Sequence, residues 1–202
     1  MDIRDGKFAV EFARKTIELW VSERKTPEIP EVSKVFREKS GVFTTIYTYP
    51  EHELRGCIGL PYPVKPLIEA IVDSAVSAAR DPRFPPLEKD ELGRIVVELS
   101  ILTKPEPIKV KKPEEYLEKI KIGRDGLIIR NGLQSGLLLP QVPVEYGWDV
   151  RTYLEHLCMK ALLPRDAWTY EGTEIFRFRS EIFGERRPRG EILKLGTGNP
   201  KP

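Results

Sequence analysis

The segment Leu54-Arg55-Gly56-Cys57-Ile58-Gly59-Leu60 places the narrowest constraint on how this chain folds. Its apolar residues alternate with residues of other kinds, as they do in a short β-strand. Two of its residues are glycines, and glycine inside a strand marks a place where a ligand or another backbone comes close. The segment also contains one of only two cysteines in the chain. We therefore expect a tightly approached strand that forms part of the functional site.

The residues around this segment predict an antiparallel sheet. Residues 41–47 are rich in β-branched and aromatic side chains, which favours a strand, and a turn at residues 50–53 would pair it with residues 54–60 as a hairpin. Residues 94–102 alternate between an apolar and a mixed face, as expected for a half-covered antiparallel strand. Glu98 lies on the mixed face, where it is either an edge residue or part of a site.

Helical spacing of apolar residues predicts long helices at residues 5–25, 66–80 and 149–162, and a short one at residues 113–120. Further strands are expected at residues 126–130, 136–139 and 174–180. Residues 140–143 contain two prolines and are expected to form a stiff loop.

The distribution of charge separates a body from a tail. The formal net charge is +2, but residues 184–202 hold five Lys or Arg against two Glu, so the remainder is close to neutral. We expect one domain over residues 1–183, followed by a basic, flexible tail over residues 184–202. A neutral body gives no electrostatic reason to expect nucleic acid as a partner.

Other features of the composition bear on location and habitat. The N-terminus is polar, no apolar run is long enough to cross a membrane, and two cysteines cannot form a disulfide framework, so we expect a cytoplasmic protein. Gln, Asn, Cys and Met are scarce, whereas Lys, Arg, Glu and Pro are plentiful. This profile is typical of proteins from hyperthermophiles.

Cys57 is the first candidate for chemistry. A thiol is a nucleophile as its thiolate, and a nearby cation such as Arg55 would lower its pKa. The alternative is a small buried side chain that only lines a site. His52 is the candidate base, or else a solvated turn residue. His156 is expected to be structural, because residues two apart on a helix do not face each other and it cannot pair with Cys158.

A second cluster consists of Asp81, Arg83 and Phe84 in a proline-rich loop, which forms either a ligand wall or a clamp within the loop. Gln141, between Pro140 and Pro143, is suited to orient a bound group. The sequence lacks the ligand spacing of a closed zinc site and the glycine-rich phosphate loops, so we predict neither a metal nor a cofactor.

Several segments together resemble the AMMECR family, which is named after a human contiguous-gene syndrome. The resemblance covers roughly residues 7–180 and rests on Leu54-Arg55-Gly56-Cys57-Ile58-Gly59, Ala79-Arg80-Asp81-Pro82-Arg83-Phe84-Pro85-Pro86 and Leu138-Leu139-Pro140-Gln141-Val142, with Trp148, Cys158-Met159-Lys160-Ala161, Ile95-Val96-Val97-Glu98-Leu99-Ser100 and Gly41-Val42-Phe43-Thr44. Together with the composition, it suggests an archaeal member.

The resemblance implies an α+β fold, with a curved, mostly antiparallel or barrel-like sheet, packed helices, and a larger and a smaller part. It also implies one cleft that gathers the motif segments, and an association with Memo-type and radical-SAM proteins. The family has no established biochemical activity.

From the residues and the resemblance together, we expect a cleft that binds a small molecule or a peptide segment. Arg55 and Arg83 would hold an anionic group, Gly56 and Gly59 would give it room, and Cys57 would line the site or attack. An enzyme of this kind would be a cysteine-dependent transferase or hydrolase. The alternative is a non-enzymatic interaction or regulatory module.

Overall fold

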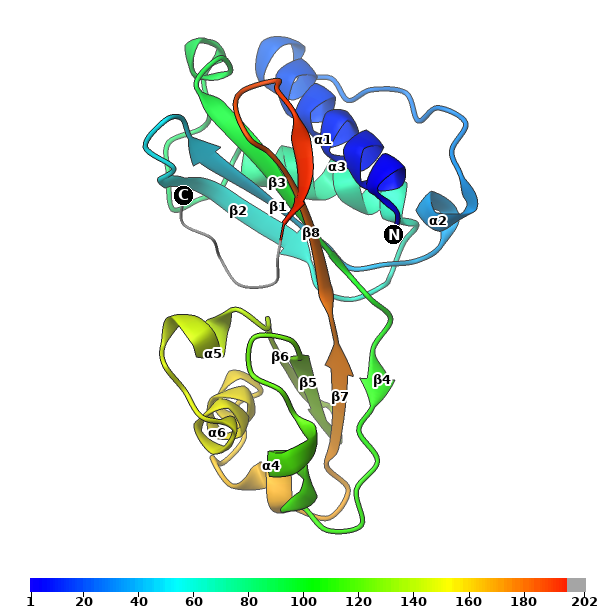
Figure 1. Cartoon of the computed structure of the whole chain (residues 1–202), viewed down its shortest axis with the longest axis vertical. Helices are drawn as coiled ribbons and strands as arrows, with labels where there is room; N and C mark the ends of the chain where they lie inside the picture. Colours follow the sequence, from blue (N-terminus) through cyan, green and yellow to red (C-terminus); the bar gives the residue numbers. More distant parts are fainter. Residues whose placement is uncertain (196–202) are drawn as a thin grey trace. The chain divides into compact units, whose positions relative to one another are not determined.

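A computed structural model describes residues 1–195 of the chain (Figure 1). Contacts within the chain divide it into two compact units, each described here by itself. Unit 1 comprises residues 1–102 and 181–195, and unit 2 comprises residues 103–180. The predicted α+β class is confirmed, and the strands form two open sheets rather than a barrel.

Unit 1 is a five-stranded sheet in the order β2-β1-β3-β8-β9, with helices α1 and α3 on one face (Figure 1). Its elements are α1 (Ile3–Glu23), α2 (Lys34–Arg37), β1 (Val42–Thr48), β2 (Leu54–Leu60), α3 (Leu67–Ala78), the 3-10 turn η1 (Lys89–Glu91), β3 (Ile95–Leu102), β8 (Ser180–Glu185) and β9 (Ile192–Leu195).

The helices of unit 1 arise from the periodicity that predicted them. Helix α1 begins after Asp2, whose carboxylate accepts a hydrogen bond from the Asp5 amide at 2.8 Å, and it ends at Arg24 in the left-handed conformation. The apolar faces of α1 and α3 pack with every second residue of β1 and β3. The face of β1 and β3 that points away from α1 and α3 is therefore the one that can carry polar side chains.

Unit 2 is a four-stranded sheet in the order β4-β7-β5-β6, with a core between the sheet and helix α6. Its elements are β4 (Glu106–Pro107), α4 (Glu115–Lys119), β5 (Gly126–Asn131), β6 (Gln134–Leu138), α5 (Val142–Glu145), α6 (Val150–Lys160), the 3-10 turn η2 (Ala167–Thr169) and β7 (Glu174–Phe178). As expected, Asp149 caps α6, because its carboxylate accepts from the Thr152 amide at 2.8 Å.

Two local predictions differ from the structure in unit 2. The connection between β5 and β6 is shorter than expected, because Asn131 pairs with Gln134 and leaves a two-residue turn. The segment predicted as a stiff loop after Pro140 contains a short helix, α5, with Pro143 in its first turn. Proline is compatible with that position, because the first turn of a helix does not use its amide hydrogens.

The predicted tail is the largest difference. Residues 184–195 complete β8 and form β9, while residues 196–202 lie outside the described residues. Strand β9 pairs with β8 in antiparallel register, and Glu185 makes a buried ion pair with Arg14 of α1. The Glu185 carboxylate also accepts from the Val97 amide at 3.0 Å. A basic composition predicted solvation here, but these long-range contacts hold the segment in the sheet.

Candidate functional site

Three side chains from adjacent strands form a row on the face of the unit 1 sheet opposite α3. Thr45 of β1 pairs with Cys57 of β2 on one side and with Glu98 of β3 on the other. Directly opposite residues of neighbouring antiparallel strands point to the same face. Thr44, the next residue, points to the other face and is hydrogen-bonded to Ser74 of α3 at 2.7 Å. We call Cys57, Thr45 and Glu98 the Cys57 row.

The thiol of Cys57 is held in its neutral form. The Thr45 hydroxyl donates a hydrogen bond to the Cys57 sulfur at 3.3 Å. Burial raises the pKa of the Cys57 thiol, and the Thr45 hydrogen bond and the charge of Arg83 oppose that rise only in part. Of the two roles left open for Cys57, the raised pKa favours the side chain that lines the site over a prepared thiolate, although the side chain is only half-buried.

Arg55 does not supply the positive charge that we expected beside Cys57. The β1–β2 register shifts between Ile46 and Tyr47, so Arg55 has no partner in β1. Its guanidinium binds both carboxylate oxygens of Glu91, at 2.7 and 2.9 Å, and the Pro85 carbonyl at 2.9 Å. Arg55 thus ties β2 to the proline-rich loop, and its charge is neutralised there.

The proline-rich loop clamps the backbone of Cys57. The buried carboxylate of Asp81 accepts from the Cys57 amide at 2.8 Å, and it binds the Arg83 guanidinium through Nη2 at 2.6 Å. Arg83 also donates through Nη2 to the Cys57 carbonyl at 3.2 Å. The Arg83 hydrogen bond is the main reason that the pKa of Asp81 lies well below its usual range. Of the two readings of this loop, the contacts favour the clamp.

The remaining residues of the motif have packing partners within the protein. A Cβ atom on Gly56 would lie 2.3 Å from the Ala78 carbonyl oxygen, and one on Gly59 would lie 2.4 Å from the Phe43 ring. Gly56 therefore allows the backbone of α3 to approach β2, and Gly59 allows the Phe43 ring to pack against β2. Phe84 lies beside the clamp, with the Arg83 guanidinium carbon 5.6 Å from its ring centroid.

Neither histidine hydrogen-bonds to a cysteine. His52 lies in the β1–β2 turn, stacked on Tyr47 with 4.3 Å between ring centroids. Tyr47 is two residues from Thr45, roughly 7 Å along β1, so the residue on which His52 stacks lies outside the Cys57 row. In unit 2, His156 stacks on Trp148 at 3.8 Å.

Gln141 belongs to unit 2, where it precedes α5. Its side-chain oxygen is buried and has no hydrogen-bond partner within the described chain. A buried acceptor without a donor is unfavourable, which marks Gln141 as a residue whose side chain suits an additional donor. It is not grouped here with the Cys57 row, because the two lie in different units.

Glu98 was left open between a structural and a functional role, and Thr45 was not singled out at all. Burial raises the pKa of Glu98 to about 7. No hydrogen bond or ion pair joins its carboxyl to another residue between 1 and 195, and Gly184 of β8 leaves space beside it. A carboxyl that titrates near neutral pH suits proton transfer. The sequence did hold a signal for Thr45, because pairing the two strands of the predicted hairpin sets Thr45 opposite Cys57.

We expect Glu98→Gln to flatten the dependence of stability on pH. The folded chain keeps a proton on Glu98 up to about pH 7, whereas the unfolded chain releases it near the ordinary pKa of about 4.3. The free energy of unfolding therefore falls as pH rises between these values, by on the order of 3–4 kcal/mol. Guanidinium denaturation between pH 4 and 8 measures the slope. The exposed Glu51→Gln variant should keep it, and parallel curves for wild type and Glu98→Gln would contradict the assignment.

Two absences concern metals and membranes. Within residues 1–195, no group of three or more His, Cys, Asp or Glu side chains is arranged to hold a metal ion. In the same part of the chain, no helix has both the length and the apolar character needed to cross a bilayer.

Comparison with known proteins identifies the family. The sequence profile of the AMMECR1 family matches residues 10–183. The chain is 58% identical to Protein MJ0810 of Methanocaldococcus jannaschii over 195 residues, 96% of each protein, and 48% identical to Protein MK0488 of Methanopyrus kandleri, over 95% of this chain and 94% of that protein. The crystal structure of the uncharacterized protein PH0010 from Pyrococcus horikoshii superposes with a TM-score of 0.84 at 47% identity, covering 97% of this chain and 98% of that one. The chain therefore belongs to the AMMECR1 family.

Proposed function

We propose that unit 1 binds a small molecule or a peptide segment over the Cys57 row, and that Cys57 reacts with it in a thiol-dependent transfer or hydrolysis. The observation that supports this most is the row itself, which places a thiol, a hydroxyl and a carboxyl on three adjacent strands. The carboxyl has a pKa of about 7, which matches the requirements of a general base.

Binding would use the clamp beside the row. The Arg83 side chain is 55% exposed, and Asp81 and the Cys57 carbonyl engage its Nε and Nη2 atoms. Its Nη1 atom has no hydrogen bond to any described residue and is available for an anionic group of the ligand. The Phe84 ring under the guanidinium would give the ligand an apolar contact.

The reaction would begin from a neutral thiol. Glu98 acts as base and takes up the Cys57 proton through an intervening water, and the sulfur attacks an electrophilic carbonyl carbon of the ligand. A C–S bond forms, the bond to the leaving group breaks, and that group takes the proton from Glu98. Water or a second acceptor then cleaves the thioester, completing hydrolysis or transfer. Keeping the thiol protonated until a ligand arrives would protect it from oxidation.

Alkylation of Cys57 by iodoacetamide as a function of pH tests the thiol step. We expect Cys57 to react with an apparent pKa above the ordinary value of about 8.5, because burial raises it. Cys158 is fully buried, and burial raises its pKa to about 11, so it is an unreactive control in the same molecule. Thr45→Val removes a hydrogen bond that lowers the Cys57 pKa and should shift the profile to higher pH.

Two outcomes would count against the proposal. A Cys57 that stays unreactive at every pH at which the protein is folded would exclude the thiol as a nucleophile. A panel of carboxylate and acyl compounds that raises the melting temperature equally in wild type and Arg83→Gln would exclude the clamp as the binding site. Cys57→Ser should retain binding while losing any turnover.

A non-enzymatic interaction module is the second candidate. Unit 2 exposes large apolar side chains, with Leu133 and Leu162 exposed by 105% and 86%, and Tyr146 by 69%. Gln134, the residue after Leu133, donates a hydrogen bond to the Leu162 carbonyl at 3.0 Å, so the two leucines lie near each other, and a contiguous exposed apolar patch marks an interaction site. By its family resemblance, the partner to test is a purified Memo-type or radical-SAM protein. Binding that survives Cys57→Ala but is lost in Leu133→Ser/Leu162→Ser would favour this candidate.

A further inference from the structure

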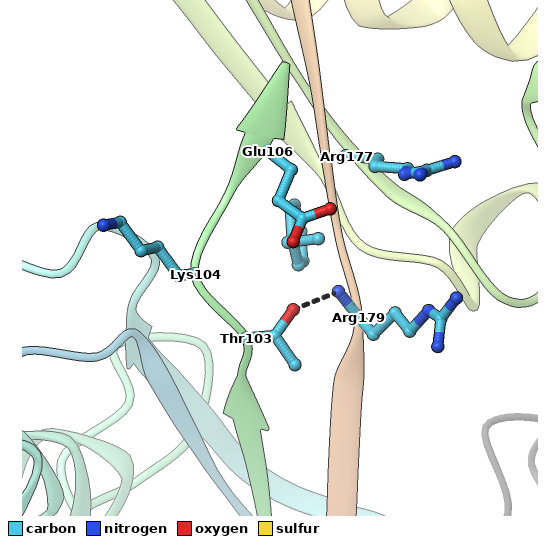
Figure 2. Close-up of a pocket in the computed structure, with 6 residues that line it drawn as sticks. Thr103, Lys104, Glu106, Arg177 and Arg179 are labelled. Atoms are coloured by element: carbon cyan, nitrogen blue, oxygen red, sulfur yellow. Dashed lines mark hydrogen bonds between the residues drawn. The ribbon is translucent and has the colours of Figure 1, made fainter. Parts of the chain in front are cut away.

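A second potential site lies in unit 2, between strands β4 and β7. A cavity of about 300 Å³ is lined by Thr103, Lys104, Glu106, Arg177, Phe178 and Arg179 (Figure 2). None of these residues belongs to the motif segments of the sequence. We propose that this cavity binds a hydroxyl-bearing phosphate monoester of about the size of a pentose phosphate. Arg177 and Arg179 would hold the phosphate, and Glu106 would accept from the hydroxyl groups.

The two arginines are arranged to act together. Arg177 lies in β7 and Arg179 directly follows the end of that strand, so in extended backbone their side chains leave the same side of the chain roughly 7 Å apart. Figure 2 shows both side chains extending to the same side of the strand. Neither guanidinium makes a hydrogen bond or an ion pair with another residue in the described part of the chain. Two adjacent cations without partners repel each other, and a bound dianion would remove that cost.

Other charges near the arginines do not substitute for a ligand. Arg177 acts through space on the buried carboxylate of Asp125, but Asp125 is already bound by Arg124 at 2.8 Å through each of its oxygens. The Thr103 hydroxyl is neutral and accepts a hydrogen bond from the Arg179 amide at 2.8 Å (Figure 2). Lys104 points away from the arginines in Figure 2 and contributes only its positive charge.

Glu106 gives the cavity an acceptor as well as donors. It stands directly opposite Arg177 in the β4–β7 register, so both side chains leave the same face. The pair forms no salt bridge, and the Glu106 carboxylate is exposed. An ionised carboxylate only accepts hydrogen bonds, and sugar hydroxyls are suitable donors. The cavity therefore combines a dianion site with a hydroxyl site.

Charge and size narrow the ligand class. A planar guanidinium can donate two parallel hydrogen bonds to two oxygens of a phosphate, so a pair of arginines binds it by several charge-assisted hydrogen bonds. Two guanidinium groups suit a dianionic phosphate better than a single carboxylate. A volume of about 300 Å³ is at the lower end for ligand sites, which favours a sugar phosphate over a nucleotide.

Calorimetric titration of the full chain with ribose 5-phosphate and with inorganic phosphate tests this proposal. We expect saturable binding of ribose 5-phosphate, weakened roughly 30-fold or more in the Arg177→Gln/Arg179→Gln double variant, because charged hydrogen bonds are lost. The matched control is Arg186→Gln/Arg187→Gln, which removes the same charge from a different cavity, in unit 1, and should leave the affinity unchanged within about 2-fold.

Glu106→Gln distinguishes the two parts of the ligand. It should weaken ribose 5-phosphate about 5-fold, since one acceptor is replaced, while leaving inorganic phosphate bound at least as well. Absence of saturable binding to the wild-type chain, or equal losses in the two double variants, would overturn the proposal. Equal weakening of both ligands by Glu106→Gln would overturn the assignment of the hydroxyl site. None of these results depends on the reactivity of Cys57.

Discussion

Asp81→Ala is expected to lower the free energy of unfolding by about 3 kcal/mol or more, since it removes the buried acceptor of several hydrogen bonds. The Asp81 side chain is 1% exposed, and it accepts hydrogen bonds from the Cys57 amide, the Arg83 amide and the Arg83 guanidinium. Alanine leaves those donors without an acceptor and frees the loop from β2. Guanidinium denaturation at neutral pH measures the loss.

Acidification should reproduce part of this effect in the wild-type chain. The Arg83 hydrogen bond lowers the folded-state pKa of Asp81 below its unfolded value of about 3.9. The stabilisation is therefore complete above that value and is lost as pH falls through the folded-state pKa. Asp81→Asn keeps an acceptor for the Cys57 amide but cannot titrate, so it should remove this acid-range slope.

Asp90→Ala is the matched control for the clamp. Its ion pair with Arg94 is exposed, by 73% at the aspartate and 69% at the arginine, and exposed pairs contribute about 1 kcal/mol or less. A loss for Asp81→Ala no larger than that for Asp90→Ala would show that the clamp does not stabilise the motif.

Gly56→Ala is expected to destabilise unit 1 by about 3 kcal/mol, at the upper end of the usual cost of overpacking. The added Cβ would lie 2.3 Å from the Ala78 carbonyl oxygen and 3.2 Å from its carbon. These are backbone atoms in the last turn of α3, so they cannot move aside by a change of rotamer. Strand β2 and helix α3 would have to separate.

Gly93→Ala provides the comparison for this prediction. No atom lies within 4 Å of a Cβ at Gly93, and its backbone is not in the left-handed region. Its replacement should change stability by no more than about 0.5 kcal/mol. Thermal unfolding of both variants measures the difference. Similar melting temperatures would mean that the α3–β2 approach is not tight.

Local pattern in the sequence was sufficient to predict most elements. The four-residue apolar spacing of α1, the β-branched run of β1 and the cap at Asp149 each depend on residues close together in the chain. Such features are set by the backbone period and by capping chemistry, which a single sequence displays. The AMMECR1 family could be recognised for the same reason, since its motif segments are contiguous.

The tertiary structure decided which side chains meet. Only the strand register aligns Cys57, Thr45 and Glu98 in one row across three strands, and only long-range packing assigns Gly56 to a helix backbone and Arg55 to Glu91. The four-residue strand β9 is too short to carry a periodic signal, and it exists because β8 pairs with it. The sequence alone thus determined the elements and the location of the motif, whereas pairing between distant residues determined the environment of its thiol.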